Sequence, residues 1–130
     1  LGVNVLSIPA ARAAIARAEA GDAAVASAAF RLTQESEHQA GVVVYRAVHG
    51  PQGPAGGPPR GLVFLTMRME DALARLVEGT PGYLQACLLD ADAPPELRHL
   101  AGPAACAAAA DGATVQRSAL PFAGRQWELR

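Results

Sequence analysis

The sequence predicts an α+β domain in which antiparallel strands are flanked by helices. Two apolar runs, residues 41–49 and 61–68, are rich in the β-branched and aromatic residues that favour strands. The segment between them, residues 50–60, holds four Gly and four Pro, so we expect it to be a hairpin connection. From Met69 onward the apolar residues take helical spacing.

Ahead of this hairpin we expect one helix and one strand. The helix is predicted over residues 10–20, with Ser7 as its cap and Pro9 in its first turn. Its apolar face is narrow and built from Ile8, Ala11, Ile15 and Ala18. Residues 24–32 are predicted to be extended, and the polar residues 33–40 to form a turn into the central strand.

After the hairpin, helical and extended segments alternate. The helix over residues 70–78 should bury Met69, Leu73, Leu76 and Val77 and should end at Gly79. The remaining predicted elements are a strand over 83–90, a turn over 91–95, a short helix over 96–100, an Ala-rich helix over 104–110, and strands over 114–120 and 121–130 that meet near Gly124. Trp127 is expected to anchor the core.

Composition and charge indicate which kinds of binding partner the chain is expected to have. The formal net charge is −1, and the chain has no Lys and no basic stripe, so we expect no nucleic-acid partner. No run approaches the roughly 20 apolar residues that a transmembrane helix needs. The start at Leu1 suggests a fragment of a longer protein. Cys87 should pack structurally, and a disulfide with Cys106 stays open, because it needs an oxidising compartment.

The sequence offers no catalytic or metal-binding pattern. His38, His49 and His99 are isolated, and solvent exposure is the expected role of each. Glu70 and Asp71 begin a helix, where they complement its dipole. We therefore expect no enzyme activity, no metal and no cofactor in this chain. Polar residues within apolar strands are more informative, because Ser27, Tyr45 and Arg46 could line a pocket floored by the sheet; an Arg facing solvent on an edge strand is the alternative.

Five segments, taken together, resemble the CHASE domain, the extracytoplasmic sensor module of transmembrane histidine kinases and cyclic-dinucleotide enzymes. They follow the family order and are residues 14–22, 25–32, 41–49, 60–73 and 122–129. The last of these is similar to a closing G-R-x-W-x-L strand. The third departs from the family pattern, with Ala47 where Pro is usual and His49 where Tyr is usual.

The resemblance implies antiparallel PAS-like sheets in two halves. Residues 1–68 would be the C-terminal part of the membrane-distal half, and residues 69–130 the membrane-proximal half. The long N-terminal helix and the first distal strands would be missing. Flanking helices, outside this chain, would continue into transmembrane segments and would be its only contact with the membrane.

The same resemblance implies a ligand site on the distal sheet. Ser27 matches a pocket Thr, and Val44 and Arg46 fall on the pocket-facing side of their strand. Tyr45, Val63 and Leu65 complete the predicted ligand-binding residues. Arg46 stands where plant cytokinin receptors have an aromatic residue, so an anionic or otherwise different small molecule is the expected ligand.

The predicted function is thus a small-molecule sensor on the periplasmic or extracellular side of a bacterial membrane receptor. It would act as a homodimer and signal to a cytoplasmic kinase or cyclase. One rival is a structural spacer and dimerisation module that binds no ligand. Another is a small enzyme of unknown type, which the absent catalytic patterns argue against.

Overall fold

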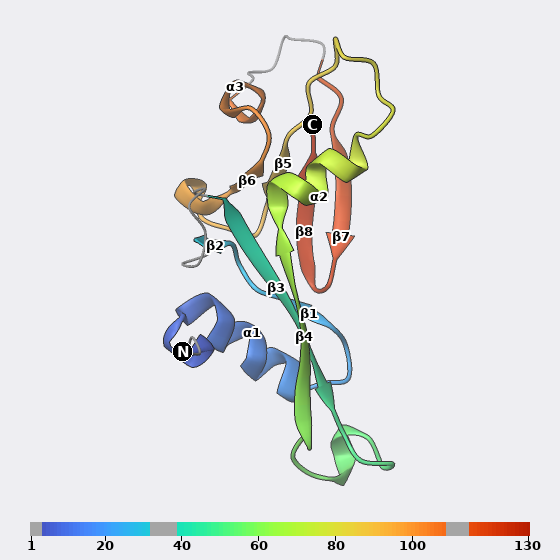
Figure 1. Cartoon of the computed structure of the whole chain (residues 1–130). Helices are drawn as coiled ribbons and strands as arrows, with labels where there is room; N and C mark the ends of the chain where they lie inside the picture. Colours follow the sequence, from blue (N-terminus) through green and yellow to red (C-terminus); the bar gives the residue numbers. More distant parts are fainter. Residues whose placement is uncertain (1–3, 32–38, 109–114) are drawn as a thin grey trace.

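The computed structural model describes residues 4–31, 39–108 and 115–130, which form two four-stranded antiparallel sheets with flanking helices (Figure 1). The first sheet contains β1 (Val25–Ala26), β2 (Phe30–Arg31), β3 (Ala40–Val48) and β4 (Gly61–Arg68). The second contains β5 (Leu88–Asp90), β6 (His99–Ala101), β7 (Ser118–Phe122) and β8 (Arg125–Leu129). The predicted α+β class is confirmed.

Helices lie before, between and after these strands. The α-helices are α1 (Pro9–Glu19), α2 (Met69–Leu76) and α3 (Ala104–Ala107). Short 3-10 turns are η1 (Val5–Ser7), η2 (Pro54–Gly56) and η3 (Pro95–Leu97). The two sheets lie on either side of the junction between Arg68 and Met69, where β4 passes directly into α2. That they are two PAS-like halves stays a prediction.

β3 is the centre of the first sheet. It pairs with β4 over eight positions, from Gly41 opposite Arg68 to Val48 opposite Gly61, and this confirms the predicted hairpin. Along its other edge β3 pairs with two short strands in succession: β2 opposite Ala40 and Gly41, and β1 opposite Val44 and Tyr45. Over its described part, residues 24–31, the segment predicted to be extended is therefore two short strands rather than one continuous strand.

Both faces of β3 are covered near its start. On one face Val43 and Tyr45 pack against the buried side of α1, which consists of Ala11, Ala14, Ile15 and Ala18. The three Ala side chains let the helix lie close to the sheet, and Ile15 fills the space between them. On the other face Val42 joins the main core, which includes Met69, Leu73, Leu88, Leu100 and Trp127. Because successive side chains of β3 point to opposite faces, this one strand contributes residues to two separate hydrophobic cores.

Ser7 is not the cap of α1, contrary to prediction. Its hydroxyl donates to the backbone oxygen of Asn4 at 2.7 Å, and Ile8 occupies the cap position without a side-chain hydrogen bond. Asn4 instead caps η1, since its Oδ1 accepts from the backbone N–H of Leu6 at 3.1 Å. The extra turn before Pro9 takes up the residues that would otherwise cap the helix.

Several predicted elements are shorter or of another type. The strand expected over residues 83–90 is only β5, because a turn closed by a hydrogen bond from Leu84 N–H to Pro81 O precedes it. His99 lies in β6, which pairs with β5, and not in a short helix. Leu76 is exposed at the end of α2, since only Met69 and Leu73 of that helix are buried. Ala40, the last residue of the turn predicted over 33–40, is the first residue of β3. Residues 33–38 of that turn, which include His38, and the start of the predicted strand at Thr114 lie outside the described residues.

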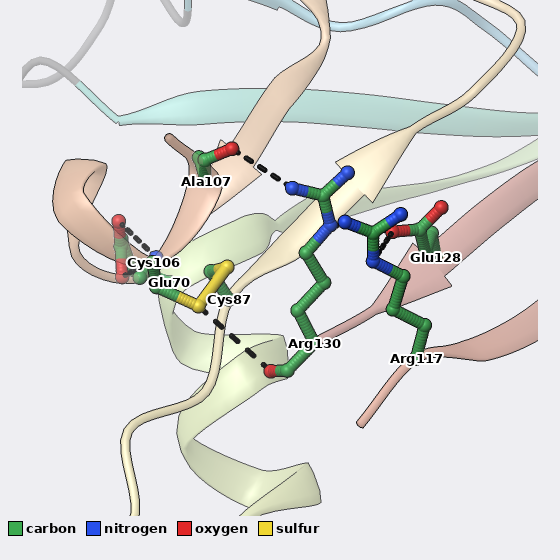
Figure 2. The surroundings of a disulfide bond; sticks show 8 residues. Glu70, Cys87, Cys106, Ala107, Arg117, Glu128 and Arg130 are labelled. Carbon is green, nitrogen blue, oxygen red and sulfur yellow. Dashed lines mark hydrogen bonds and ion pairs between the residues drawn. A yellow bond between two sulfur atoms is a disulfide. The ribbon is translucent and has the colours of Figure 1, made fainter. Parts of the chain in front are cut away.

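A disulfide joins Cys87 to Cys106, with their Cα atoms 5.9 Å apart (Figure 2). It ties the residue before β5 to α3, and the Sγ of Cys106 lies 3.9 Å from the backbone oxygen of Arg130. The pairing that the sequence left open is thus made. Disulfides persist in oxidising compartments, which agrees with an extracytoplasmic protein.

Candidate ligand-binding face

Four of the six predicted ligand-binding residues lie on one face of the first sheet. Val44 is directly opposite Leu65, and Arg46 is directly opposite Val63. Because side chains two residues apart on a strand share a face, these two cross-strand pairs are neighbours. They form one continuous surface, which we call the β3–β4 face: Val44, Arg46, Val63 and Leu65.

The β3–β4 face is open along most of its area. Val63 is 56% exposed and Leu65 is 62% exposed, whereas Val44 is half-buried and packs against the main core. Arg46 is exposed and makes no hydrogen bond or ion pair with another residue in the described part of the chain. An apolar surface with one unpaired guanidinium can take a ligand that combines a negative group with an apolar body.

Tyr45 lies on the opposite face. It pairs with Val25 and Phe64, its side chain is buried against α1, and its ring centroid is 6.2 Å from that of Phe64. Burial raises the pKa of the Tyr45 hydroxyl above its usual value of 10.0. The structure therefore does not bring Tyr45 together with Arg46, its neighbour in sequence.

Ser27 is buried and forms hydrogen bonds with the backbone of Val43. It is 1% exposed, and its Oγ accepts from the N–H of Val43 at 3.1 Å while its own N–H donates to the Val43 oxygen at 2.9 Å. These bonds continue the contact of β1 with β3 beyond Ala26. The Ser27 hydroxyl thus stabilises the sheet, because it accepts a hydrogen bond from the buried Val43 N–H. A buried N–H without a partner would cost free energy of folding.

The sequence reasoning missed a buried ion pair in the second sheet. Asp90 is fully buried, and its Oδ2 accepts from both Nε and Nη2 of Arg125 at 2.7 Å. Its Oδ1 accepts from the N–H of Asp92 at 3.1 Å. The sequence did contain a signal for this pair, because Asp90 directly follows Leu88 and Leu89 in an apolar run. A carboxylate buried in such a run needs a charged or hydrogen-bonding partner.

A second missed contact involves Glu70. Both of its carboxylate oxygens lie 3.2 Å from the backbone N–H of Gly102, so this side chain links the first turn of α2 to the end of β6. Besides its expected favourable interaction with the helix dipole, Glu70 therefore accepts a specific hydrogen bond from Gly102. Neither this contact nor the Asp90–Arg125 pair includes a residue of the β3–β4 face, and both join segments that are distant in sequence.

The histidines and acidic groups that the structure describes do not form a metal site. No cluster of three or more His, Cys, Asp or Glu side chains occurs within residues 4–31, 39–108 and 115–130. His49 is not solvent-exposed as predicted: it is half-buried, and its Nε2 lies 3.1 Å from the backbone oxygen of Gly21. His99 is exposed, as predicted. The described helices include none that is long and apolar enough to cross a membrane.

These features define the class: an α+β domain, held by a disulfide, that presents an open sheet face with one unpaired cation. The family model of the CHASE domain matches residues 1–99, which is well over half of the chain. The chain therefore belongs to the CHASE domain family. CHASE domains are extracellular sensor modules of receptors, including two-component receptors, and they are sensor domains rather than catalytic ones. A search of curated proteins finds no match.

Proposed function

We propose that this domain senses a small anionic molecule that binds on the β3–β4 face. The observation that carries the proposal is the pairing of exposed Arg46 with exposed Val63, next to Val44 and Leu65. An Arg guanidinium presents a planar fork of donors that fits a carboxylate or phosphate in two bonds. The three apolar neighbours offer surface to the rest of the ligand.

An added strand from the parent receptor would enclose this face. Within the described residues β4 pairs only with β3, and three of its residues are more than half exposed: Val63 and Leu65 on one face of the sheet and Phe64 on the other. A long apolar edge strand is normally paired or covered. We therefore expect a distal strand, from outside residues 1–130, to pair with β4 and to wall the ligand site.

The second sheet offers a route for the signal. The N–H of Ala26 in β1 donates to the oxygen of Ala123 at 2.8 Å, and Nη2 of Arg17 in α1 donates to the oxygen of Gly124 at 3.1 Å. Both bonds end on the turn between β7 and β8. A ligand that binds one arrangement of the first sheet more tightly would shift β8 with it. The expected outputs are a cytoplasmic histidine kinase or diguanylate cyclase of a membrane-anchored, dimeric receptor.

A thermal-shift screen of the complete extracytoplasmic region tests the proposal. Purines, amino acids, organic acids and short peptides are the probes. A ligand at about 100 times its Kd, bound only to the folded state, stabilises it by roughly 2.7 kcal/mol. We expect an acidic compound to raise the melting temperature, and Arg46→Ala to abolish the rise while the unliganded melting temperature stays unchanged, because Arg46 is exposed.

Arg12→Ala is the matched control. Arg12 is an exposed arginine on the outer side of α1, away from the β3–β4 face, and the variant removes the same charge. It should keep the full ligand shift. Equal loss in both variants would indicate a non-specific charge effect, and no shift with any compound would contradict the sensor proposal.

A spacer and dimerisation module is the second candidate. The observation in its favour is Ser27, which is only 1% exposed and whose Oγ accepts from the Val43 N–H, so this predicted pocket residue lies within the contact between strands rather than at an open surface. A silent screen, together with loss of receptor dimerisation when this domain is deleted, would support this alternative.

A further inference from the structure

The loop between α2 and β5 is uncharged and projects from the domain. Residues 79–86 contain no Asp, Glu, Lys, Arg or His, and residues 79–85 are all exposed. Tyr83 is 84% exposed and Leu84 is 58% exposed, and Leu76, four residues before Thr80, is 58% exposed at the end of α2. Large exposed side chains of this kind, on an uncharged loop, raise the question of which surface the loop meets.

Hydrogen bonds give this loop a defined shape. The Oγ1 and the N–H of Thr80 both donate to the oxygen of Val77, at 2.8 and 3.0 Å, and close the end of α2. The N–H of Leu84 donates to the oxygen of Pro81 at 3.0 Å and closes a second turn. Tyr83 is a central residue of that turn, so its side chain lies at the tip of the loop.

The loop lies at the same end of the domain as Arg130. Cys87, which ends the loop, exchanges two backbone hydrogen bonds with Arg130, at 3.0 and 3.1 Å. Figure 1 shows the loop beyond α2 and the C-terminal residue together at one end, and the β3–β4 hairpin with η2 at the opposite end. A surface that meets the loop therefore lies far from that hairpin.

We propose that Tyr83 and Leu84 insert into the headgroup region of the lipid bilayer beneath the receptor. This inference rests on the proposed function, a membrane-anchored receptor, and on the expectation from the family resemblance that residues 69–130 are its membrane-proximal half. It assigns the loop, residues 79–86, as a direct lipid contact of the sensor domain itself, in addition to any transmembrane segments of the receptor.

The chemistry of the loop fits a bilayer interface better than a charged protein surface. Tyr is enriched at membrane–water interfaces, because its ring enters the apolar boundary while its hydroxyl stays hydrated. Leu84 adds apolar surface beside it. The nearest charges along the chain, Arg75 and Glu78, are 3.5 Å apart and balance each other. No charged group of the loop itself would have to enter the headgroup layer.

Tryptophan emission in nanodiscs tests the inference. The full receptor carrying Tyr83→Trp is reconstituted into phosphatidylcholine nanodiscs, with and without brominated acyl chains, which quench a tryptophan that touches them. Native Trp127 is buried and contributes a constant background. We expect brominated lipid to remove most of the emission added at position 83, and Leu84→Trp to behave in the same way.

Phe64→Trp is the matched control, since Phe64 is an exposed aromatic residue on β4 and lies outside the loop. Its emission should be unaffected by bromination. If the receptor co-purifies with the nanodisc but neither position 83 nor 84 is quenched, the loop inference is overturned while the membrane anchoring stands. If the receptor does not co-purify with the nanodisc, the anchoring fails and the inference falls with it.

Discussion

The carboxylate of Asp90 and the guanidinium of Arg125 form a buried ion pair that joins β5 to the first residue of β8. Two donors of Arg125 meet one oxygen of Asp90 at 2.7 Å, and the Arg125 side chain is only 10% exposed. The neighbouring Asp92 supports the same junction, since its Oδ2 accepts from the N–H of Gln126 at 2.8 Å. Side chains at the end of β5 and just after it therefore hold the start of the G-R-x-W-x-L segment in place.

Removing Asp90 should strongly destabilise the domain. Asp90→Ala leaves the Arg125 charge buried without its partner, which costs about 3–5 kcal/mol in proteins. We expect a loss of this size in the free energy of unfolding, measured by urea denaturation. Glu78→Gln is the control, because the Glu78–Arg75 pair is exposed on both sides and is worth about 0–1 kcal/mol. Similar losses in both variants would refute the importance of the buried pair.

Gly102 should tolerate no larger residue. Its φ is +90°, and a Cβ there would meet the backbone oxygen of Ala86 and lie 2.8 Å from the Cα of Cys87. Backbone strain and overpacking together predict a loss of roughly 2–4 kcal/mol for Gly102→Ala. Gly21→Ala is the control, since a Cβ at Gly21 meets nothing within 4 Å. An unchanged unfolding midpoint for Gly102→Ala would show that the close contact is absent in solution.

Reduction of the Cys87–Cys106 disulfide should weaken the second sheet. The bond closes a loop with a sequence separation of 19 residues, and a loop near this length contributes about 3 kcal/mol. Urea denaturation with and without a reducing agent measures the difference. The double variant Cys87→Ala/Cys106→Ala should unfold at the reduced midpoint and should not respond to the reducing agent. A wild-type protein that is equally insensitive would contradict a formed disulfide.

Tyr45 should make the domain sensitive to high pH. Because burial raises its pKa in the folded state, ionisation is easier in the unfolded chain. The stability that neutral Tyr45 contributes is complete below the unfolded pKa of about 10 and is lost as pH rises through the folded pKa. As pH rises from 8 to about 11, the unfolding free energy of the wild type should fall relative to that of Tyr45→Phe, because only the wild type carries this titrating hydroxyl. Parallel curves would show that Tyr45 does not titrate differently on unfolding.

Local pattern predicted the hairpin well. Residues 61–68 and the helix start at Met69 follow from composition and spacing alone, and the structure places both as expected. The same period-two rule separates Tyr45 from Arg46, since adjacent strand residues face opposite sides. Applied across the hairpin, it groups Arg46 with Val63 and Val44 with Leu65, as the register shows.

Long-range contacts explain the errors. The bond between Asp90 and Arg125 spans 35 residues, and the one between Glu70 and Gly102 spans 32 residues, so no local spacing marks either pair. Leu76 has helical spacing with Leu73, but α2 buries only Met69 and Leu73. Tyr83 lies in an apolar run typical of a strand, yet the turn from Pro81 to Leu84 leaves it exposed. Tertiary pairing, which propensity does not encode, decides these positions.

Backbone hydrogen exchange of the complete extracytoplasmic region, with and without the ligand found in the screen, tests the central claim most directly. If the ligand binds on the β3–β4 face, peptides covering residues 40–48 and 61–68 exchange more slowly in its presence. Arg46→Ala should remove that protection and leave the exchange of the unliganded domain unchanged. Protection confined to other segments, or protection that survives Arg46→Ala, would contradict a ligand site on this face.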